Sequence, residues 1–258
     1  MSNESKYQQT NVNAIIGSIK EAAQRSDDDF MFWFDPSENV KESISRGYWD
    51  FSFNILTKEV CKYTADPHEK VAMEIGYGGG RLLNVACKYY KKAIGIDIHD
   101  EKIKVENFLK EQGNNNFKLL QTSGSLIDYE SESVDLIYSF IVLCHMESLD
   151  TFNNYLKESY RCLKPGGIAQ LYYAGFANAP RSIKKQMLFK SHFSTRPDLS
   201  AVSGPLVLPY TYIKQREVIK LCKQLNFKIV DTGVAYKKAP DGYPQKRGIQ
   251  NYCTLLKL

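Results

Sequence analysis

Three closely spaced glycines after a short apolar stretch are the residues best suited to bind a ligand. Gly76, Gly78 and Gly80 stand at alternate positions directly after 71–75, and a further glycine, Gly79, lies between the last two. Glycine lets the backbone adopt positive φ and lets a ligand approach the main chain closely. Apolar residues then recur at helical spacing at Leu82, Leu83, Ala86, Cys87 and Tyr90. The stretch therefore predicts a strand, a tight turn and a helix whose free N–H groups face a ligand.

A carboxylate near the end of the next apolar stretch adds a second chemical feature. Asp97 lies near the end of 92–98, 21 residues after Gly76. At that separation a carboxylate on a neighbouring strand end can accept hydrogen bonds from the hydroxyls of a ribose. The alternative role, an N-cap for the helix predicted over 101–112, falls to Asp100. The turn and the acid together favour a ribose-containing ligand over an empty structural turn.

The glycine spacing excludes two common nucleotide-binding motifs. A G-x-G-x-x-G fingerprint counted from Gly76 would place its third glycine where Arg81 stands. No Gly-Lys-Ser/Thr follows the turn, so the phosphate-binding P-loop motif is absent as well.

The E-x-G-x-G-x-G pattern over 74–80 resembles the first motif of class I S-adenosylmethionine-dependent methyltransferases. The strand 134–140, followed by an apolar run and His145, is similar to the fourth motif of that family. The turn R-x-L-K-P-G-G at 161–167 is the most specific part of the resemblance. Its glycines end a helix and its proline prevents the helix from continuing. The resemblance covers 68–174 motif by motif, and 211–258 by element order.

This resemblance implies a site for S-adenosyl-L-methionine and no metal. The glycines would shape the turn against the methionine moiety, Asp97 would bind the ribose, and Ile98 would pack on the adenine. Ser123 and Gly124 would line the adenine edge, although the family usually has an acid where Ser123 stands. The cofactor is a cation without phosphate, which suits a site with acids. The implied cofactor residues are Glu74, Gly76, Gly78, Gly80, Asp97, Ile98, Ser123, Gly124 and Phe140.

Methyl transfer is an in-line displacement, so the protein must chiefly position two reactants and exclude water. A hydroxyl nucleophile also needs a general base. The candidates are His145 after the fourth strand, His192 in a long loop and Tyr173 at the end of the fifth strand. His145 has the alternative role of a histidine that packs within the core. Arg46 or Arg81 would be available to pair with the carboxylate of the cofactor.

The composition favours a cytoplasmic globular enzyme. The 258 residues are 43% hydrophobic, and the net charge of +5 is spread along the chain rather than concentrated in a patch. Nucleic acid is therefore an unlikely partner. The N-terminal residues lack an apolar signal core, and the run 136–146 is too short to span a membrane. Six widely separated cysteines favour reduced thiols. The sequence leaves both a monomer and a homodimer open.

Alternating strands and helices from residue 71 onward predict an α/β fold. We expect a Rossmann-like, doubly wound, mostly parallel seven-stranded sheet with an antiparallel last strand. Residues 1–66, with an amphipathic helix over 11–25, are expected to form a helical cap within the same unit. Residues 67–258 would form the cofactor-binding domain, with a substrate loop at 175–212. The last two strands are expected at 227–236 and 250–258.

The predicted function is methyl transfer to an oxygen or nitrogen of a small-molecule acceptor such as a sugar, a lipid precursor or a secondary metabolite. Aromatic residues in the cap favour a closed pocket for such a molecule. Basic residues in 181–196 leave an RNA or protein methyltransferase as an alternative. The serine at position 123 leaves a third possibility, a non-catalytic protein that binds the cofactor.

Overall fold

The computed structural model describes residues 3–35, 37, 39–124, 126–146, 148–176, 179, 181, 183–184, 193–198, 208–236 and 249–258. His192, one of the predicted base candidates, lies outside these residues.

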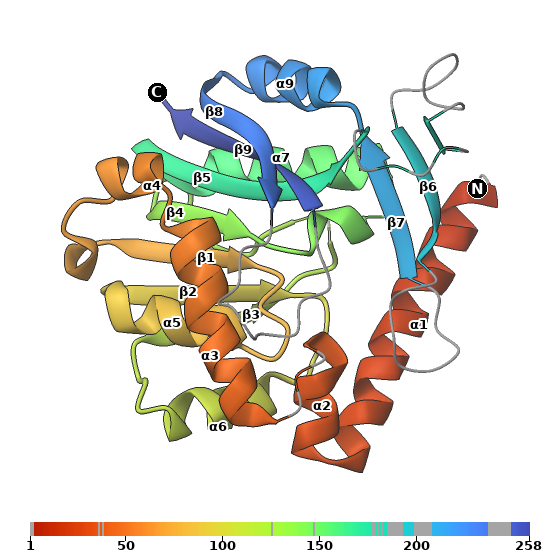
Figure 1. Cartoon of the computed structure of the whole chain (residues 1–258), viewed down its shortest axis with the longest axis vertical. Coiled ribbons are helices and arrows are strands. Elements are labelled where there is room, and N and C mark those ends of the chain that lie inside the picture. The colour runs from red at the N-terminus through yellow and green to blue at the C-terminus, as the bar shows by residue number, and fades with distance from the viewer. Residues whose placement is uncertain are drawn as a thin grey trace.

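Helices occupy most of the chain that precedes the sheet (Figure 1). Ser26, Asn39 and Thr57 each accept a hydrogen bond from the backbone N–H three residues ahead, which fixes where α2, α3 and α4 begin. Helix α1 starts at Asn3, eight residues before the predicted stretch. The elements are α1 (Asn3–Arg25), α2 (Asp27–Phe34), α3 (Val40–Asp50), the π-helical η1 (Phe51–Ile55), α4 (Lys58–Tyr63) and the 3-10 turn η2 (Pro67–Glu69).

Seven strands form the predicted sheet. The neighbours run in the order β3-β2-β1-β4-β5, all parallel, and β9 then pairs antiparallel with β5 and with β8. The expected mostly parallel sheet with an antiparallel last strand is confirmed. The strands are β1 (Val71–Ile75), β2 (Lys92–Asp97), β3 (Phe117–Gln121), β4 (Val134–Ser139), β5 (Leu163–Gly175), β8 (Phe227–Tyr236) and β9 (Ile249–Lys257).

Two further strands lie within 175–212, where we predicted only a loop. Strands β6 (Phe193–Asp198) and β7 (Leu208–Ile213) pair antiparallel with each other. Strand β7 also pairs parallel with the end of β5, at Ala174↔Tyr212 and Gly175↔Ile213. Within the described residues, the sheet therefore has nine strands. The prolines and glycines in this segment concealed the strands, because they read as loop residues.

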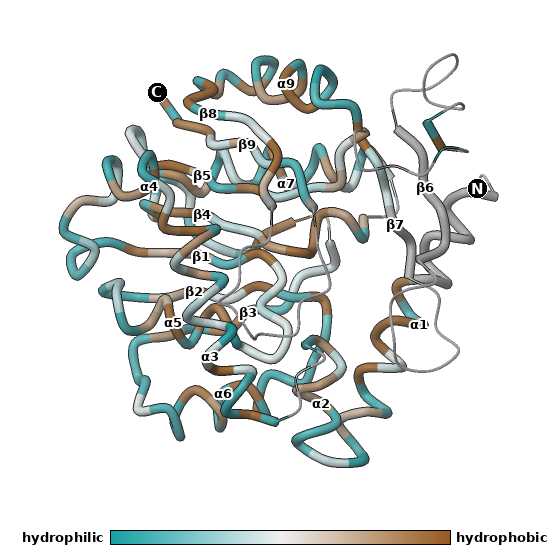
Figure 2. The backbone as a smooth tube through the Cα atoms, viewed as in Figure 1, coloured by the Kyte–Doolittle hydropathy of each residue, from teal (hydrophilic) through white to brown (hydrophobic). Residues whose placement is uncertain are grey.

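The side chains of the central strands form a core on each face of the sheet. Tyr138 of β4 belongs to the core on one face, together with residues of α3 and α5. Its neighbour Ile137 belongs to the core on the other face, together with residues of α7 and α9. Helix α9 alternates between hydrophobic and hydrophilic residues, as a helix with one face on a sheet should (Figure 2). The connecting helices are α5 (Arg81–Tyr89), α6 (Lys102–Glu111), α7 (Leu149–Cys162) and α9 (Gln215–Gln224). Among the described residues, no helix has the length and apolar character to cross a bilayer.

Candidate functional site

The glycine turn after β1 has the backbone that its sequence predicts. Gly76, Gly78 and Gly80 adopt φ values of 77°, 50° and 86°, in the region that disfavours residues with a Cβ. The turn connects the carboxyl end of β1 to α5. It lies where the strand order reverses between β1 and β4, which is where open α/β sheets bind ligands.

Asp97 ties the end of β2 to this turn. One carboxylate oxygen accepts the N–H of Gly78 at 2.8 Å, and the other accepts the N–H of Ile98 at 2.7 Å. The side chain is 11% exposed, and each oxygen has a second lone pair for an incoming hydroxyl. The predicted cap role of Asp100 is wrong, because α6 begins after Glu101 without a side-chain cap.

His99 contacts the glycine turn and holds its backbone in place, a role that the sequence did not predict. Its Nε2 lies 3.1 Å from the carbonyl oxygen of Gly78, and its Nδ1 accepts the N–H of Glu101 at 3.2 Å. These partners fit the tautomer in which Nε2 donates to Gly78 and Nδ1 accepts from Glu101. The ring is buried and packs against Tyr77 and Phe34. The only sequence signal was its position two residues after Asp97.

Helix α2 covers the turn with the aromatic cluster seen in the sequence. A Cβ added to Gly78 would lie 2.8 Å from Cδ1 of Phe34, and one added to Gly79 would lie 2.9 Å from Sδ of Met31. These contacts require glycine on steric grounds as well as for the backbone conformation. The N-terminal helices therefore reach the carboxyl edge of the sheet.

The segment after β4 faces the same turn. A Cβ on Gly76 would lie 2.4 Å from Cγ2 of Val142. Ile141 adopts φ of 62°, which is strained for a β-branched residue and is often found at functional sites. Phe140 is buried, with its ring edge-on to Tyr172 at 5.1 Å between centroids. The predicted cofactor residues of β1 and β4 thus lie on one edge of the sheet.

Both candidate arginines pair with acids of the N-terminal helices. Arg81 contacts Asp50 at 2.6 Å through Nη1 and Asp35 at 3.6 Å through Nε. Arg46 contacts the other oxygen of Asp35 at 3.1 Å. The two acids are 3% and 5% exposed at their side chains, so the ion pairs are largely shielded from water. They connect α3 to the first turn of α5.

Glu74 lies beneath the turn as a buried acid. It is 2% exposed, and its Oε2 accepts a hydrogen bond from the hydroxyl of Tyr138 at 3.1 Å. Burial raises the pKa of Glu74 to about 8, against a lowering effect of Tyr138 and Arg81. The side chain is therefore mainly protonated at pH 7.

The buried Glu74 predicts a specific pH dependence of stability. In the unfolded chain the carboxyl titrates near 4.5, so between pH 4.5 and 8 the folded protein binds the extra proton. Its contribution to stability is fully present below pH 4.5 and is lost as the pH rises to about 8, at up to about 1.4 kcal/mol per pH unit. Glu74→Gln should therefore match the wild type near pH 5 and exceed its free energy of unfolding by a few kcal/mol at pH 8. Urea denaturation across this range measures the difference, and a constant difference would contradict the buried neutral acid.

The segment after β3 contains the predicted adenine-edge residues. Ser123 is exposed, and Gly124 adopts φ of 85° while its N–H donates to Oγ1 of Thr122 at 3.1 Å. Thr122 in turn donates to the carbonyl oxygen of Leu126. The segment thus forms a hydrogen-bonded turn next to the end of β3.

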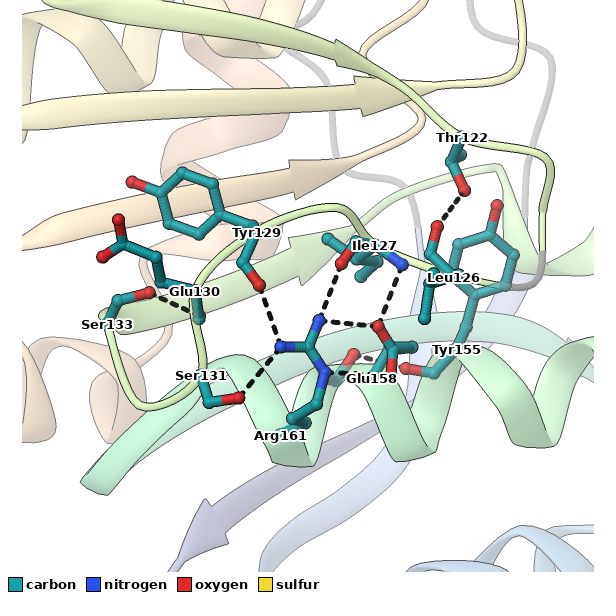
Figure 3. A network of polar contacts seen from close by, with 11 residues as sticks. Thr122, Leu126, Ile127, Tyr129, Glu130, Ser131, Ser133, Tyr155, Glu158 and Arg161 are labelled. Carbon is teal, nitrogen blue, oxygen red and sulfur yellow. Dashed lines mark hydrogen bonds and ion pairs between the residues drawn. The ribbon is translucent and has the colours of Figure 1, made fainter.

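Arg161 of α7 holds the rest of that segment (Figure 3). Its guanidinium donates to the carbonyl oxygens of Ile127 and Tyr129 at 2.7 and 2.8 Å, and to Oγ of Ser131 at 3.0 Å. It also forms an ion pair with Glu158, which accepts the N–H of Ile127 at 2.9 Å. Arg161 therefore fixes the loop between β3 and β4, as well as opening the R-x-L-K-P-G-G turn.

The described candidate bases lie on different parts of the site. His145 ends the 3-10 turn η3 (Leu143–His145), is half-buried, and follows the strained segment after β4. Tyr173 lies in the core against Phe152, on the opposite face of β5 from Tyr172. Burial raises the pKa of Tyr173 above its usual value, and its hydroxyl has no hydrogen-bond partner among the residues that the structure describes.

Residues 73–171 match the family model described as a methyltransferase domain. A protein of Dictyostelium discoideum with a provisional methyltransferase name is 28% identical over 153 residues, which cover 58% of this chain and 55% of that protein. The chain spans about half the length of the curated relatives it matches.

Solved structures share the fold of most or all of this chain. A S-adenosylmethionine-dependent methyltransferase of Methanosarcina mazei superimposes with a TM-score of 0.62 at 20% identity, covering 79% of this chain and 98% of its own. The 1,6-didemethyltoxoflavin-N1-methyltransferase of Burkholderia thailandensis, solved with that acceptor and S-adenosylhomocysteine, gives a TM-score of 0.59 at 15% identity. That superposition covers 100% of this chain and 91% of the other.

Proposed function

We propose that this chain is a class I S-adenosylmethionine-dependent methyltransferase and that it transfers a methyl group to an oxygen or nitrogen of a small-molecule acceptor. The observation that carries this proposal is the contact between Asp97 and the glycine turn. This contact puts Asp97, the acid proposed to bind the ribose, next to the backbone of the glycine turn at the switch point of the sheet.

The residues of this edge fit S-adenosyl-L-methionine. Asp97 keeps acceptor capacity for two ribose hydroxyls, and half-buried Ile98 offers an apolar surface for the adenine. The positive φ values of Gly76 and Gly78 present a turn that a methionine chain can approach. Ser123 and Gly124 would take the adenine edge, and Phe140 would lie near the sulfonium. When bound, the cofactor supplies a methyl group on a sulfonium, which is an activated electrophile.

The protein would hold the cofactor and the acceptor in position and exclude water from the reaction. Phe140 and Tyr172 form a buried aromatic wall beside the end of β4. Helix α2 lies over the glycine turn, which supports the proposal that residues 1–66 belong to the same unit as the sheet. A covered site of this kind favours an acceptor small enough to be enclosed. The neighbour from Burkholderia, whose superposition spans this whole chain, has a small acceptor and lends support to that class.

Titration calorimetry with S-adenosylhomocysteine, run beside NAD, tests the cofactor part of the proposal. We expect binding of S-adenosylhomocysteine alone, because the glycine spacing does not match the NAD fingerprint. Equal affinity for NAD, or no affinity for S-adenosylhomocysteine, would overturn the proposal.

His145 is proposed as the general base for a hydroxyl acceptor. It follows β4 at the carboxyl edge of the sheet, on the turn next to Val142. We expect His145→Gln to lower kcat for such an acceptor by 10²- to 10⁴-fold, the usual contribution of a positioned base. Affinity for S-adenosylhomocysteine should be unchanged. The rate of transfer of a tritiated methyl group measures kcat, and a variant that retains the full rate would leave His145 with a packing role only.

A further inference from the structure

Gln250, at the start of β9, is a buried carboxamide with only one weak hydrogen bond. The residue is 6% exposed, and its Nε2 lies 3.5 Å from Sγ of Cys144. Its Oε1 is buried and has no hydrogen-bond partner in the described structure. Exchanging the two amide atoms would leave the NH₂ group in that position instead, so half of the carboxamide is unpaired in either orientation.

A second buried glutamine provides a contrast. Gln170 of β5 is fully buried, and its Nε2 donates to the hydroxyl of Tyr172 at 3.2 Å. Its Oε1 accepts from Oγ1 of Thr254 at 2.6 Å. An unpaired buried carbonyl costs about 1–3 kcal/mol of stability, and native proteins rarely leave one without a reason. Gln170 thus has the paired environment expected of a structural residue, and Gln250 does not.

The place of Gln250 in the fold connects it with the proposed reaction. Its backbone neighbours lie beside the carboxyl end of β5, because Asn251 pairs with Tyr173. The side chain shares a face of β9 with Tyr252, whose ring lies 5.9 Å from that of Tyr172. Its partner Cys144 immediately precedes His145 on the turn after β4. The amide therefore contacts the turn that bears the candidate base, and it lies on the face of β9 that carries Tyr252, a neighbour of Tyr172.

We infer that Gln250 anchors the methyl acceptor, and that the acceptor presents a lactam or carboxamide edge on a flat ring. The inference rests on the proposed function, and it narrows the chemical class of the acceptor. A glutamine amide offers a carbonyl and an N–H side by side, and it pairs best with a group that offers the complementary N–H and carbonyl. The neighbouring rings of Phe140 and Tyr172 supply an apolar surface suited to a planar molecule.

Thermal unfolding of two matched variants tests whether the amide is free in the protein. Gln250→Leu should unfold at the wild-type temperature or above it, because it removes an unpaired buried group. Gln170→Leu should unfold several degrees lower, because it removes the hydrogen bonds that Gln170 makes with the hydroxyls of Thr254 and Tyr172. A clear loss of stability in Gln250→Leu would assign the amide a structural role and overturn the inference.

Small probes test recognition directly. With S-adenosylhomocysteine at saturation, the wild type should bind 2-pyridone about tenfold more tightly than N-methyl-2-pyridone, which lacks the N–H donor. Gln250→Leu should lose this preference while its affinity for S-adenosylhomocysteine stays within about twofold. NMR titration measures both probes. Equal binding of the two probes by the wild type, no binding of either, or a preference that survives in Gln250→Leu would overturn the inference. Failure of the proposed function would differ, because the wild type would then not bind S-adenosylhomocysteine.

Discussion

Replacing Asp97 by alanine should weaken the binding of S-adenosylhomocysteine by about a hundredfold or more. The carboxylate holds the N–H groups of Gly78 and Ile98, and it is the group proposed to accept the ribose hydroxyls. Hydrogen bonds to a charged group are each worth about 1.5–3 kcal/mol. Losing two to the ligand costs about 3 kcal/mol or more, and each 1.4 kcal/mol is a tenfold change in affinity.

The control for this experiment lies three residues further along the chain. Asp100 is exposed and does not cap α6, so Asp100→Ala should retain the wild-type affinity. Titration calorimetry of both variants, with their folding checked by circular dichroism, separates the site from a general charge effect. Wild-type affinity in Asp97→Ala would contradict the ribose assignment.

Replacing Arg81 by methionine should destabilise the protein by about 3–5 kcal/mol, the usual cost of breaking a buried ion pair. The substitution leaves Asp50 without its 2.6 Å partner and Asp35 without one of its two guanidinium contacts. For a chain of this size, that loss lowers the unfolding temperature by on the order of 10 °C. The effect should appear in thermal unfolding without any ligand.

An exposed pair provides the comparison. Arg25, at the end of α1, and Asp29, in the first turn of α2, have side chains 60% and 45% exposed, so Arg25→Met should have an effect within about 0.5 kcal/mol. Adding Asp50→Asn to Arg81→Met should cost much less than Asp50→Asn alone, because the charge that it removes has already lost its partner. Additive losses in this cycle would mean that the two residues do not stabilise each other.

The sequence predicted the parts of the site that depend on local backbone geometry. Gly76, Gly78 and Gly80 indicated positive φ because few other residues tolerate it, and all three have it. Asp97 could be located because the carboxyl ends of parallel strands lie at a common edge of the sheet, so a residue at a strand end can be placed there from the sequence. The mostly parallel sheet followed from the alternation of strands and helices.

The contacts between distant segments could not be predicted in this way. Nothing in the spacing of Arg161 indicates that its guanidinium would hold the carbonyls of Ile127 and Tyr129, more than thirty residues earlier. His99 looked like any residue after a strand, because its partners lie on the turn and on α2. From the sequence, Arg81 could equally pair with a ligand, because its partner Asp50 lies beside it only in the folded protein.

The junction between β5 and β7 bears on how such proteins diversify. Strand β7 joins the sheet through two residue pairs at the tip of β5. The glycine turn, Asp97 and the hydrogen bonds of Arg161 to the loop after β3 all lie on β1 to β4 and the helices that follow them. A duplicated gene could therefore lengthen, shorten or replace the β6–β7 segment while the rest of the fold is inherited intact. Since this hairpin belongs to the segment proposed as the substrate loop, such an exchange could alter acceptor specificity while the inherited half remains under separate selection.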